Sequence, residues 1–223
     1  MIQHIGSIDR EMMEMEDNTG IIVENVSKSF GKERVLDNIS FAIPPGSIYG
    51  VVGNNGSGKT VLMKCICGFM KCDTGRIIVN GKLVGREVDF PDHLGVIIET
   101  PGFIPNLSGY KNMKILAALK GRIGKAEIRE TLQRVGLQPD MKKPVAKYSL
   151  GMRQRLGIAQ AIMENPSVLV LDEPFNGLDR YGVMEIRALL KELKAAGKSI
   201  LLASHNAQDI EELCDHVQDL MGA

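Results

Sequence analysis

One short segment constrains this chain more than any other, the run Gly53-Asn54-Asn55-Gly56-Ser57-Gly58-Lys59-Thr60. It fits the pattern G-x-x-x-x-G-K-[ST], in which glycines let successive backbone N–H groups point inward at phosphate oxygens. In such a loop the lysine, Lys59, reaches the β- and γ-phosphates, and the hydroxyl of Thr60 binds Mg²⁺. The segment therefore predicts a binding site for a nucleoside triphosphate.

The residues on both sides of this loop support that interpretation. Residues Ser47 to Val52 form a short, mostly apolar run that is typical of a buried strand, and residues Lys59 to Ile66 can form a helix. A flexible glycine turn is the alternative interpretation. A strand before and a helix after the loop favour the phosphate site.

Composition narrows the class of protein. The 223 residues are 44% hydrophobic and 24% charged, as in an ordinary globular protein with one sizeable core. Lys plus Arg equals Asp plus Glu at 27 each, so no net charge favours nucleic acid as a partner. The apolar stretches are shorter than the roughly 18 residues of a membrane span, and no signal peptide is visible. We expect a cytoplasmic protein that binds no nucleic acid.

Four cysteines, Cys65, Cys67, Cys72 and Cys214, raise the question of a metal site. No CxxC pair occurs, and Cys65 and Cys67 lie two residues apart on an expected helix, so their side chains point to different faces. We expect reduced cysteines that contribute to packing, which fits a reducing compartment.

Hydrophobic periodicity divides the chain. Residues 1–20 are polar and predict a flexible extension, followed by a single domain over residues 21–223. The first third of this domain is rich in expected strands. Helical spacing then dominates residues of about 100–165, including a helix that Ser149 can cap. After this helical subdomain, strands at Val168–Leu171 and Ser199–Ala203 flank a long amphipathic helix, a pattern that predicts an α/β fold with a largely parallel sheet.

A pair of acidic residues ends the first of these two strands. Asp172 can reach the ligand shell of Mg²⁺, and Glu173 can orient or deprotonate a water that attacks the γ-phosphate. Two solvated acids at a strand end are the alternative. The upstream phosphate loop favours the catalytic interpretation.

A third element lies about two dozen residues before the acid pair. The run Lys147-Tyr148-Ser149-Leu150-Gly151-Met152-Arg153-Gln154-Arg155 resembles the signature segment, LSGGQ, of the ATP-binding cassette (ABC) family. Asn176-Gly177-Leu178-Asp179 is similar to that family's D-loop, and Ala203-Ser204-His205-Asn206 to its switch-histidine segment. The resemblance implies a P-loop NTPase core with a mostly parallel sheet, an N-terminal antiparallel β subdomain and an inserted α-helical subdomain.

The resemblance also implies roles that single residues would not establish. It implies that Phe30 stacks on adenine, although a lone phenylalanine more often belongs to the core. It implies that His205 senses the γ-phosphate, although it could be an ordinary strand-end histidine. Ser149 and Gly151 would cover the nucleotide held by a partner chain, and Asp179 would lie at that subunit interface. A helix N-terminal acid is the alternative for Asp179.

The chain departs from the family pattern at three positions. Glu99 stands where the family has the Q-loop glutamine, and a carboxylate there can still face Mg²⁺ or the attacking water, as an acceptor only. Leu150 and Met152 replace a glycine and a glutamine of the signature. These replacements make the signature loop bulkier and less polar, but leave the Ser149 hydroxyl and the Gly151 amide available.

The family resemblance implies an ATP-binding and ATP-hydrolysing transporter subunit that uses ATP and Mg²⁺. Its partners would be a second ATP-binding subunit, identical or different, and a separate multi-span permease that holds it on the inner face of the cell membrane. Segments around Glu99, Pro101–Leu107 and Tyr148–Met152 resemble exporter cassettes for bacitracin, lantibiotic peptides and drugs. The alternatives are a soluble ABC-type ATPase acting on DNA or ribosomes, and a nucleotide-dependent regulator with little hydrolysis.

Overall fold

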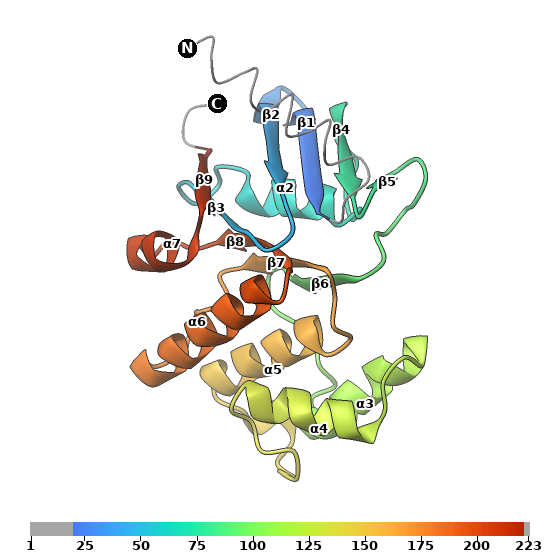
Figure 1. Ribbon diagram of the computed structural model, residues 1–223, viewed down its shortest axis with the longest axis vertical. Coiled ribbons are helices and arrows are strands. Elements are labelled where there is room, and N and C mark those ends of the chain that lie inside the picture. Colours follow the sequence, from blue (N-terminus) through green and yellow to red (C-terminus); the bar gives the residue numbers. More distant parts are fainter. Residues whose placement is uncertain (1–19, 221–223) are drawn as a thin grey trace.

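Two β-sheets lie one above the other in the computed structural model, which describes residues 20–220 (Figure 1). The upper sheet is antiparallel, with strand order β2-β1-β4-β5. Its strands are β1 (Ile21–Phe30), β2 (Glu33–Ile43), β4 (Thr74–Val79) and β5 (Lys82–Leu83). Asn80 and Gly81, both with positive φ, form the tight turn that joins β4 to β5, as the Asn-Gly pair predicts. The expected extension, residues 1–20, falls outside the described residues except for Gly20.

The lower sheet has five parallel strands in the order β6-β7-β8-β3-β9. These are β3 (Ile48–Val52), β6 (Leu94–Ile97), β7 (Val168–Asp172), β8 (Ser199–Ala203) and β9 (His216–Asp219). Because the central parallel strands β7 and β8 bury both faces, their sequences are mostly continuous apolar runs, such as Val168–Leu171, whereas the edge strand β9 is mostly polar and exposed. The prediction of a mostly parallel sheet combined with an N-terminal antiparallel β unit is confirmed.

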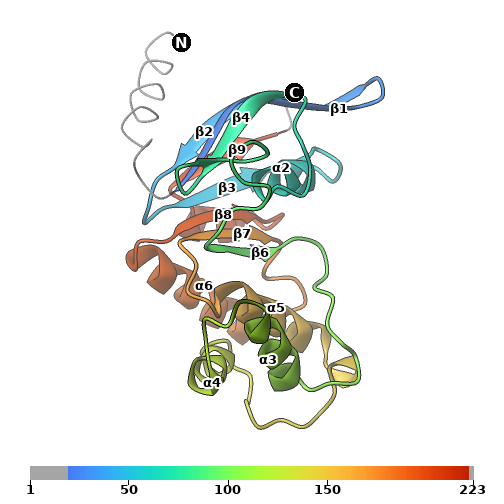
Figure 2. The ribbon, with the colours of Figure 1, turned by 90° about the vertical axis from the view of Figure 1, so that its right-hand side faces the viewer.

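Helices cover the parallel sheet on both faces (Figures 1 and 2). Helix α2 (Lys59–Ile66) lies between the two sheets, and helices α5 (Leu150–Ile162) and α6 (Arg180–Ala195) cover the opposite face. Helices α3 (Gly109–Lys120) and α4 (Lys125–Arg134) lie beyond α5, so three helices occupy the stretch predicted to be helical at about residues 100–165. Two short elements complete the fold, the 3-10 helix η1 (Val145–Lys147) and helix α7 (Ala207–Leu213).

Alternating side chains of the central strands divide the interior into two cores. In β7, Val168 and Val170 pack with α2 and the antiparallel sheet, whereas Leu169 and Leu171 pack with the helices on the other face. Strand β8 alternates in the same way, with Leu201 and Ile200 in different cores. This alternation follows from the twofold side-chain period of a strand. It fixes the register of the sheet and therefore the position of every residue that follows a strand.

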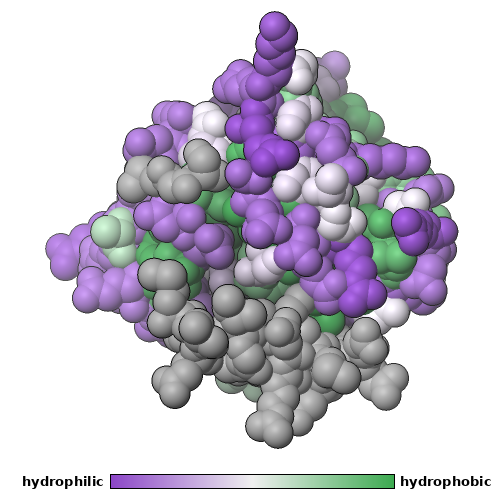
Figure 3. Space-filling view, turned by 90° about the horizontal axis from the view of Figure 1, so that it is seen from above, coloured by the Kyte–Doolittle hydropathy of each residue, from purple (hydrophilic) through white to green (hydrophobic). Residues whose placement is uncertain are grey.

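The remaining features of the fold concern its surface and its four cysteines. Seen from the end that carries the antiparallel sheet, hydrophobic residues show only as separate areas among hydrophilic ones (Figure 3). Over residues 20–220, no helix is long and apolar enough to cross a membrane. The four cysteines are unpaired, and no cluster of three or more His, Cys, Asp or Glu side chains that could hold a metal ion occurs in that part of the chain.

Candidate nucleotide-binding site

The predicted site segments meet at one edge of the parallel sheet. The phosphate loop follows β3, Glu99 lies just after β6, Asp172 ends β7, and His205 follows β8. The carboxyl ends of parallel strands share one edge, which is where ligands bind in open α/β sheets. The sheet therefore brings together segments as far apart in the sequence as Gly53 and His205.

The phosphate loop connects β3 to α2 as predicted. Gly58 has φ 96°, and a Cβ there would lie 2.9 Å from the carbonyl oxygen of Val35, so only glycine fits. The ammonium group of Lys59 donates hydrogen bonds to the carbonyl oxygens of Gly53 (2.6 Å) and Asn54 (3.0 Å). The loop and the N-terminus of α2 thus surround a lysine, which suits the binding of phosphate.

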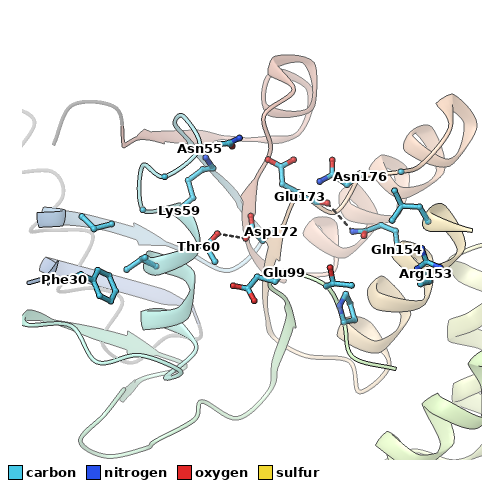
Figure 4. A pocket seen from close by; sticks show the side chains of 18 residues that line it. Phe30, Asn55, Lys59, Thr60, Glu99, Arg153, Gln154, Asp172, Glu173 and Asn176 are labelled. Atoms are coloured by element: carbon cyan, nitrogen blue, oxygen red, sulfur yellow. Dashed lines mark hydrogen bonds between the residues drawn. The ribbon is translucent and has the colours of Figure 1, made fainter. Parts of the chain in front are cut away.

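Thr60 and Asp172 lie side by side within the site (Figure 4). The Thr60 hydroxyl donates a 2.9 Å hydrogen bond to Oδ2 of Asp172. A hydroxyl and a carboxylate at this distance are the hard oxygen donors that Mg²⁺ prefers when it also binds substrate phosphates. The residues present therefore fit a magnesium ion, as the sequence predicts.

A cavity of about 800 Å³ opens beside these residues. Its lining combines the phosphate loop with residues from β1, β2, α5 and the segments after β6 and β7. The lining residues are Phe30, Val35, Asn55, Gly56, Gly58, Lys59, Thr60, Val61, Glu99, Thr100, Pro101, Leu150, Arg153, Gln154, Asp172, Glu173, Asn176 and Gly177. A cavity of this size is within the range of ligand pockets.

Glu173 and His205 form a direct pair. The Nδ1 atom of His205 lies 2.7 Å from Oε2 of Glu173, and the imidazole side chain is 69% exposed. Glu173 has φ 49°, in the left-handed region that non-glycine residues rarely adopt. Such backbone outliers cluster at functional sites, where the surroundings offset a cost of about 1–3 kcal/mol.

Hydrogen bonds behind His205 fix the segment that carries it. The guanidinium group of Arg187 donates to Oδ1 of Asp209 (2.9 Å), and both residues are buried. The other carboxylate oxygen of Asp209 accepts a hydrogen bond from the Ser204 hydroxyl (2.8 Å). This network links α6, α7 and the end of β8, and so positions the residue that precedes His205.

Glu99, like Glu173, has a positive φ (59°), and it lines the cavity. Its carboxylate accepts a 2.6 Å hydrogen bond from the ammonium group of Lys64, which lies one helical turn beyond Thr60 on α2. The structure therefore places Glu99 in the predicted region, but with a cation as its partner. Lys64 was not predicted as a site residue, although its i, i+4 spacing from Thr60 places both side chains on the same face of α2.

Phe30 lies at the opposite end of the cavity, at the end of β1 (Figure 4). Its side chain is 48% exposed, so it does not belong to the core, the alternative that a lone phenylalanine suggests. The Lys28 ammonium lies 5.7 Å from the centroid of the ring. An exposed ring in this position can stack on a planar base.

Among the described residues, the predicted residues Gly53, Asn54, Ser57 and His205 belong to segments beside the cavity without lining it, and Ser149, Gly151 and Asp179 do not line it either. The Ser149 hydroxyl accepts a hydrogen bond from the N–H of Met152 and caps α5. Asp179 caps α6 by accepting from the N–H of Gly182 (2.7 Å), which is the alternative role considered for it. Gly151 packs against the backbone of Gly177. Within one chain Ser149, Gly151 and Asp179 therefore contact residues outside the phosphate loop and do not line the cavity.

Gln154, a residue of the signature segment for which the sequence indicated no role, lines the cavity. Its amide group donates a 3.2 Å hydrogen bond to the backbone carbonyl of Glu173 (Figure 4). No sequence pattern indicates this contact, because it depends on how α5 packs beside β7.

Comparisons with known proteins agree with this site. The family model described as "ABC transporter" matches residues 36–176. The chain is 41% identical to the uncharacterized ABC transporter ATP-binding protein YybJ of Bacillus subtilis, covering 87% of the chain and 89% of YybJ. It is 42% identical to the bacitracin transport ATP-binding protein BcrA of Enterococcus faecalis, over 87% of the chain and 64% of BcrA. It is 40% identical to the lantibiotic transport ATP-binding protein SrtF of Streptococcus pyogenes, over 87% of the chain and 84% of SrtF.

Solved structures show the same fold. The structure of an ATP-binding subunit of an ABC transporter superposes with a TM-score of 0.81 at 29% identity, covering 91% of this chain and 86% of that one. A dimeric ATP-binding cassette in a post-hydrolysis state with ADP and Pi gives a TM-score of 0.80 at 23% identity, covering 90% and 94%. With the phosphate loop, the acid pair and the family match in agreement, this chain belongs to the ABC transporter family, as an ATP-binding subunit of the ATPase class.

Proposed function

We propose that this chain hydrolyses ATP to drive the export of a peptide antibiotic or drug through a separate membrane permease. One observation carries the catalytic part of the proposal. The phosphate loop, Asp172 and Glu173 lie around a single cavity, with the Thr60 hydroxyl 2.9 Å from the Asp172 carboxylate. That arrangement combines phosphate binding, two oxygen donors for a cation and a carboxylate for a water molecule.

The residues of the chain would divide the work on ATP as follows. The phosphate loop and Lys59 hold the β- and γ-phosphates, and the exposed ring of Phe30 supports the adenine. Glu173 orients the attacking water and accepts its proton, while His205, bonded to the same carboxylate, contacts the γ-phosphate. Thr60 and Asp172 would hold Mg²⁺, which neutralises charge on the phosphate oxygens.

Glu99 has a less direct place in this proposal. The Glu99 carboxylate can move from Lys64 to the cation or to the attacking water, because it lines the same cavity as Asp172 and Glu173, the residues proposed to hold them. As an acceptor only, it offers no hydrogen bond to the γ-phosphate. Its contribution would therefore be to the cation or the water.

The absence of Ser149, Gly151 and Asp179 from the cavity lining supports a site completed by a second cassette. In one chain these residues serve as a cap, a close backbone contact and a second cap, and none of them lines the cavity described above. In a head-to-tail pair, Ser149 and Gly151 would cover the partner's γ-phosphate, and Asp179 would lie at the interface. ATP would then close the pair, and hydrolysis would reopen it.

The cargo and the permease are inferred from relatives. BcrA and SrtF carry names for bacitracin and lantibiotic transport, and both are at least 40% identical to this chain. The permease would hold the chain on the inner face of the membrane, and we propose the segment after Glu99 and the helical subdomain at about residues 100–165 as its contact surface.

Two measurements test this proposal. Affinity purification of the tagged chain from detergent-solubilised membranes of its own cells should recover a multi-span membrane protein. Replacing Lys59 with Ala in those cells should increase sensitivity to bacitracin or to a lantibiotic, whereas Lys191→Ala on the exposed side of α6 should not. Recovery of ribosomes or DNA in place of a membrane protein would contradict transport, and unchanged sensitivity to both antibiotic classes would contradict the cargo.

A further inference from the structure

The backbone of Glu173 is held in its unusual conformation by three hydrogen bonds. Its N–H donates to the carbonyl oxygen of Ala203 at the end of β8 (3.0 Å). Its carbonyl oxygen accepts from the N–H of Asn176 (3.2 Å) and from Nε2 of Gln154 (3.2 Å). Since a left-handed conformation is unfavourable for an L-residue with a Cβ, these bonds decide where the carboxylate points.

Only one of these three bonds comes from a helix outside the sheet edge. Ala203 ends β8 and Asn176 lies in the turn just after β7, whereas Gln154 belongs to α5, the helix that begins at Leu150 and is capped by Ser149. Gln154 lies one turn into this helix and is half-buried. It therefore connects the helical subdomain with the backbone of the proposed base.

The first turn of α5 also touches the segment that follows Glu173. A Cβ on Gly151 would lie 2.7 Å from the carbonyl oxygen of Gly177. A Cβ on Gly177 would lie 2.4 Å from Cγ of Leu150. The two segments thus lie so near each other that not even a methyl group fits at either glycine, and α5 has little room to move toward the segment after Glu173 without displacing it. A shift of the signature turn would therefore move the loop that carries Glu173.

We propose that Gln154 is a positioning residue that couples the signature turn, Leu150 to Gly151, to the general base of the same chain. This inference rests on the proposed role of Glu173. When Ser149 and Gly151 engage a partner's nucleotide, the position of α5 is fixed, and the Gln154 amide fixes the carbonyl of Glu173. The catalytic site of one chain would thus respond to whether the signature turn of that same chain is bound to the partner's nucleotide.

The hydrogen bond from Gln154 to the carbonyl of Glu173 predicts how substitutions of Gln154 rank in turnover rate. Gln154→Ala removes the amide, and Gln154→Glu keeps the shape but places an acceptor against the carbonyl. Gln154→Lys restores an N–H donor on a side chain that can reach the same oxygen. We expect the turnover rate to fall about three- to tenfold in Gln154→Ala and Gln154→Glu, and to recover by at least half in Gln154→Lys.

The experiment measures the turnover rate and the affinity for ATP in the purified full chain, with Gln160→Ala as the control. Gln160 lies further along the same helix, is also half-buried and is not part of the nucleotide cavity. Its replacement should leave both quantities unchanged. In Gln154→Ala, which adds no charge to the cavity, the affinity for ATP should stay within twofold of the unmodified chain, because the amide acts on Glu173 and not on the nucleotide.

Combining Gln154→Ala with Glu173→Gln distinguishes a failure of the positioning role from a failure of the proposed function. In the Glu173→Gln background, Gln154→Ala should cause no further loss, since the base is already absent. Additive losses in the double variant, or weaker ATP binding with an unchanged turnover rate, would overturn the positioning role. Full activity of both Gln154→Ala and Gln154→Glu would also overturn it. Undiminished hydrolysis by Glu173→Gln alone would instead overturn the assignment of the base.

Discussion

The imidazole of His205 lies 2.7 Å from the carboxylate of Glu173, although 32 residues separate them in the sequence. The contact arises because β7 and β8 are neighbouring parallel strands, paired from Val168 and Ser199 to Asp172 and Ala203. Residues just past the ends of such strands meet at one edge of the sheet. The pair therefore combines a proposed base and a proposed phosphate sensor in one hydrogen-bonded unit.

Replacing Glu173 with Gln should reduce ATP hydrolysis by about 10²- to 10⁴-fold, because an amide cannot accept the proton of the attacking water. The amide keeps the size of the side chain, so ATP binding should persist and a closed pair of cassettes should accumulate. Steady-state hydrolysis and gel filtration with ATP measure the two effects. Glu211→Gln, on the exposed face of α7, is the matched control, and equal rates for the two variants would contradict the assignment.

The Lys64–Glu99 pair predicts a dependence between two substitutions. The Lys64 ammonium partly neutralises a carboxylate that would otherwise repel the phosphates of ATP, so Lys64→Met should raise the KM for ATP. The pair is partly exposed, with side chains 30% and 64% accessible, which limits the interaction to about 0.2–1 kcal/mol, or at most about fivefold in KM.

The charge on Glu99 should decide whether Lys64 matters. In a Glu99→Gln background, Lys64→Met should leave the KM unchanged, because no carboxylate remains to be neutralised. A double-mutant cycle on the KM for ATP measures this coupling. An identical effect of Lys64→Met in both backgrounds would mean that the lysine acts on the nucleotide directly.

Gly95 should be the most sensitive position of β6 to a small substitution. A Cβ there would lie 2.1 Å from the carbonyl oxygen of Ala161 and 2.6 Å from a methyl carbon of Leu169. Gly95→Ala should therefore destabilise the fold by about 1–3 kcal/mol or more, since β6 and α5 must separate. Urea unfolding measures the loss. Gly102→Ala is the control, because its Cβ would meet nothing within 4 Å beyond its chain neighbours, and an equal loss there would contradict the steric explanation.

The buried thiols predict how stability changes at high pH. Burial raises the pKa of Cys65 and of Cys67 from 9.0 to about 12. Thiols with the folded pKa above the unfolded one contribute their full stability below about pH 9, and lose it as the pH rises towards 12. The unfolded thiols ionise first in that window, so alkali favours the unfolded chain.

Unfolding by urea from pH 8 to pH 11 should show a decline in stability that becomes smaller in a Cys65→Ala, Cys67→Ala double variant. At pH 8 the folded thiols should also resist iodoacetamide, since only about one in 10⁴ would be ionised. Rapid labelling of Cys65 in the folded chain, matching its rate in urea, would contradict this protection.

Short motifs predicted most of the candidate site because each fixes its own local chemistry. The phosphate loop, Asp172 and Glu173 each follow an apolar strand that the pattern identifies, and the parallel sheet then brings them together. Helix α7, with seven residues, and strand β9, with four, were missed because so few residues show no clear periodicity.

Contacts between distant elements could not be predicted in this way. The hydrogen bonds from Lys64 to Glu99 and from Gln154 to Glu173 depend on how helices α2 and α5 lie on the two faces of the sheet. The cap at Asp179 is a local contact instead, three residues along the chain, and sequence allowed both this helix-capping role and an interface role. The hydrogen bond from the N–H of Gly182 shows that capping occurs.

The alternation of β7 between two cores means that this strand cannot change length by one residue. Deleting a residue between Val168 and Leu171 would exchange the two faces, so that valines and leucines would enter the wrong cores. The same deletion would turn the carboxylate of Asp172 away from Thr60. The length of this strand thus sets both the packing of the two cores and the position of the magnesium-binding carboxylate proposed at Asp172.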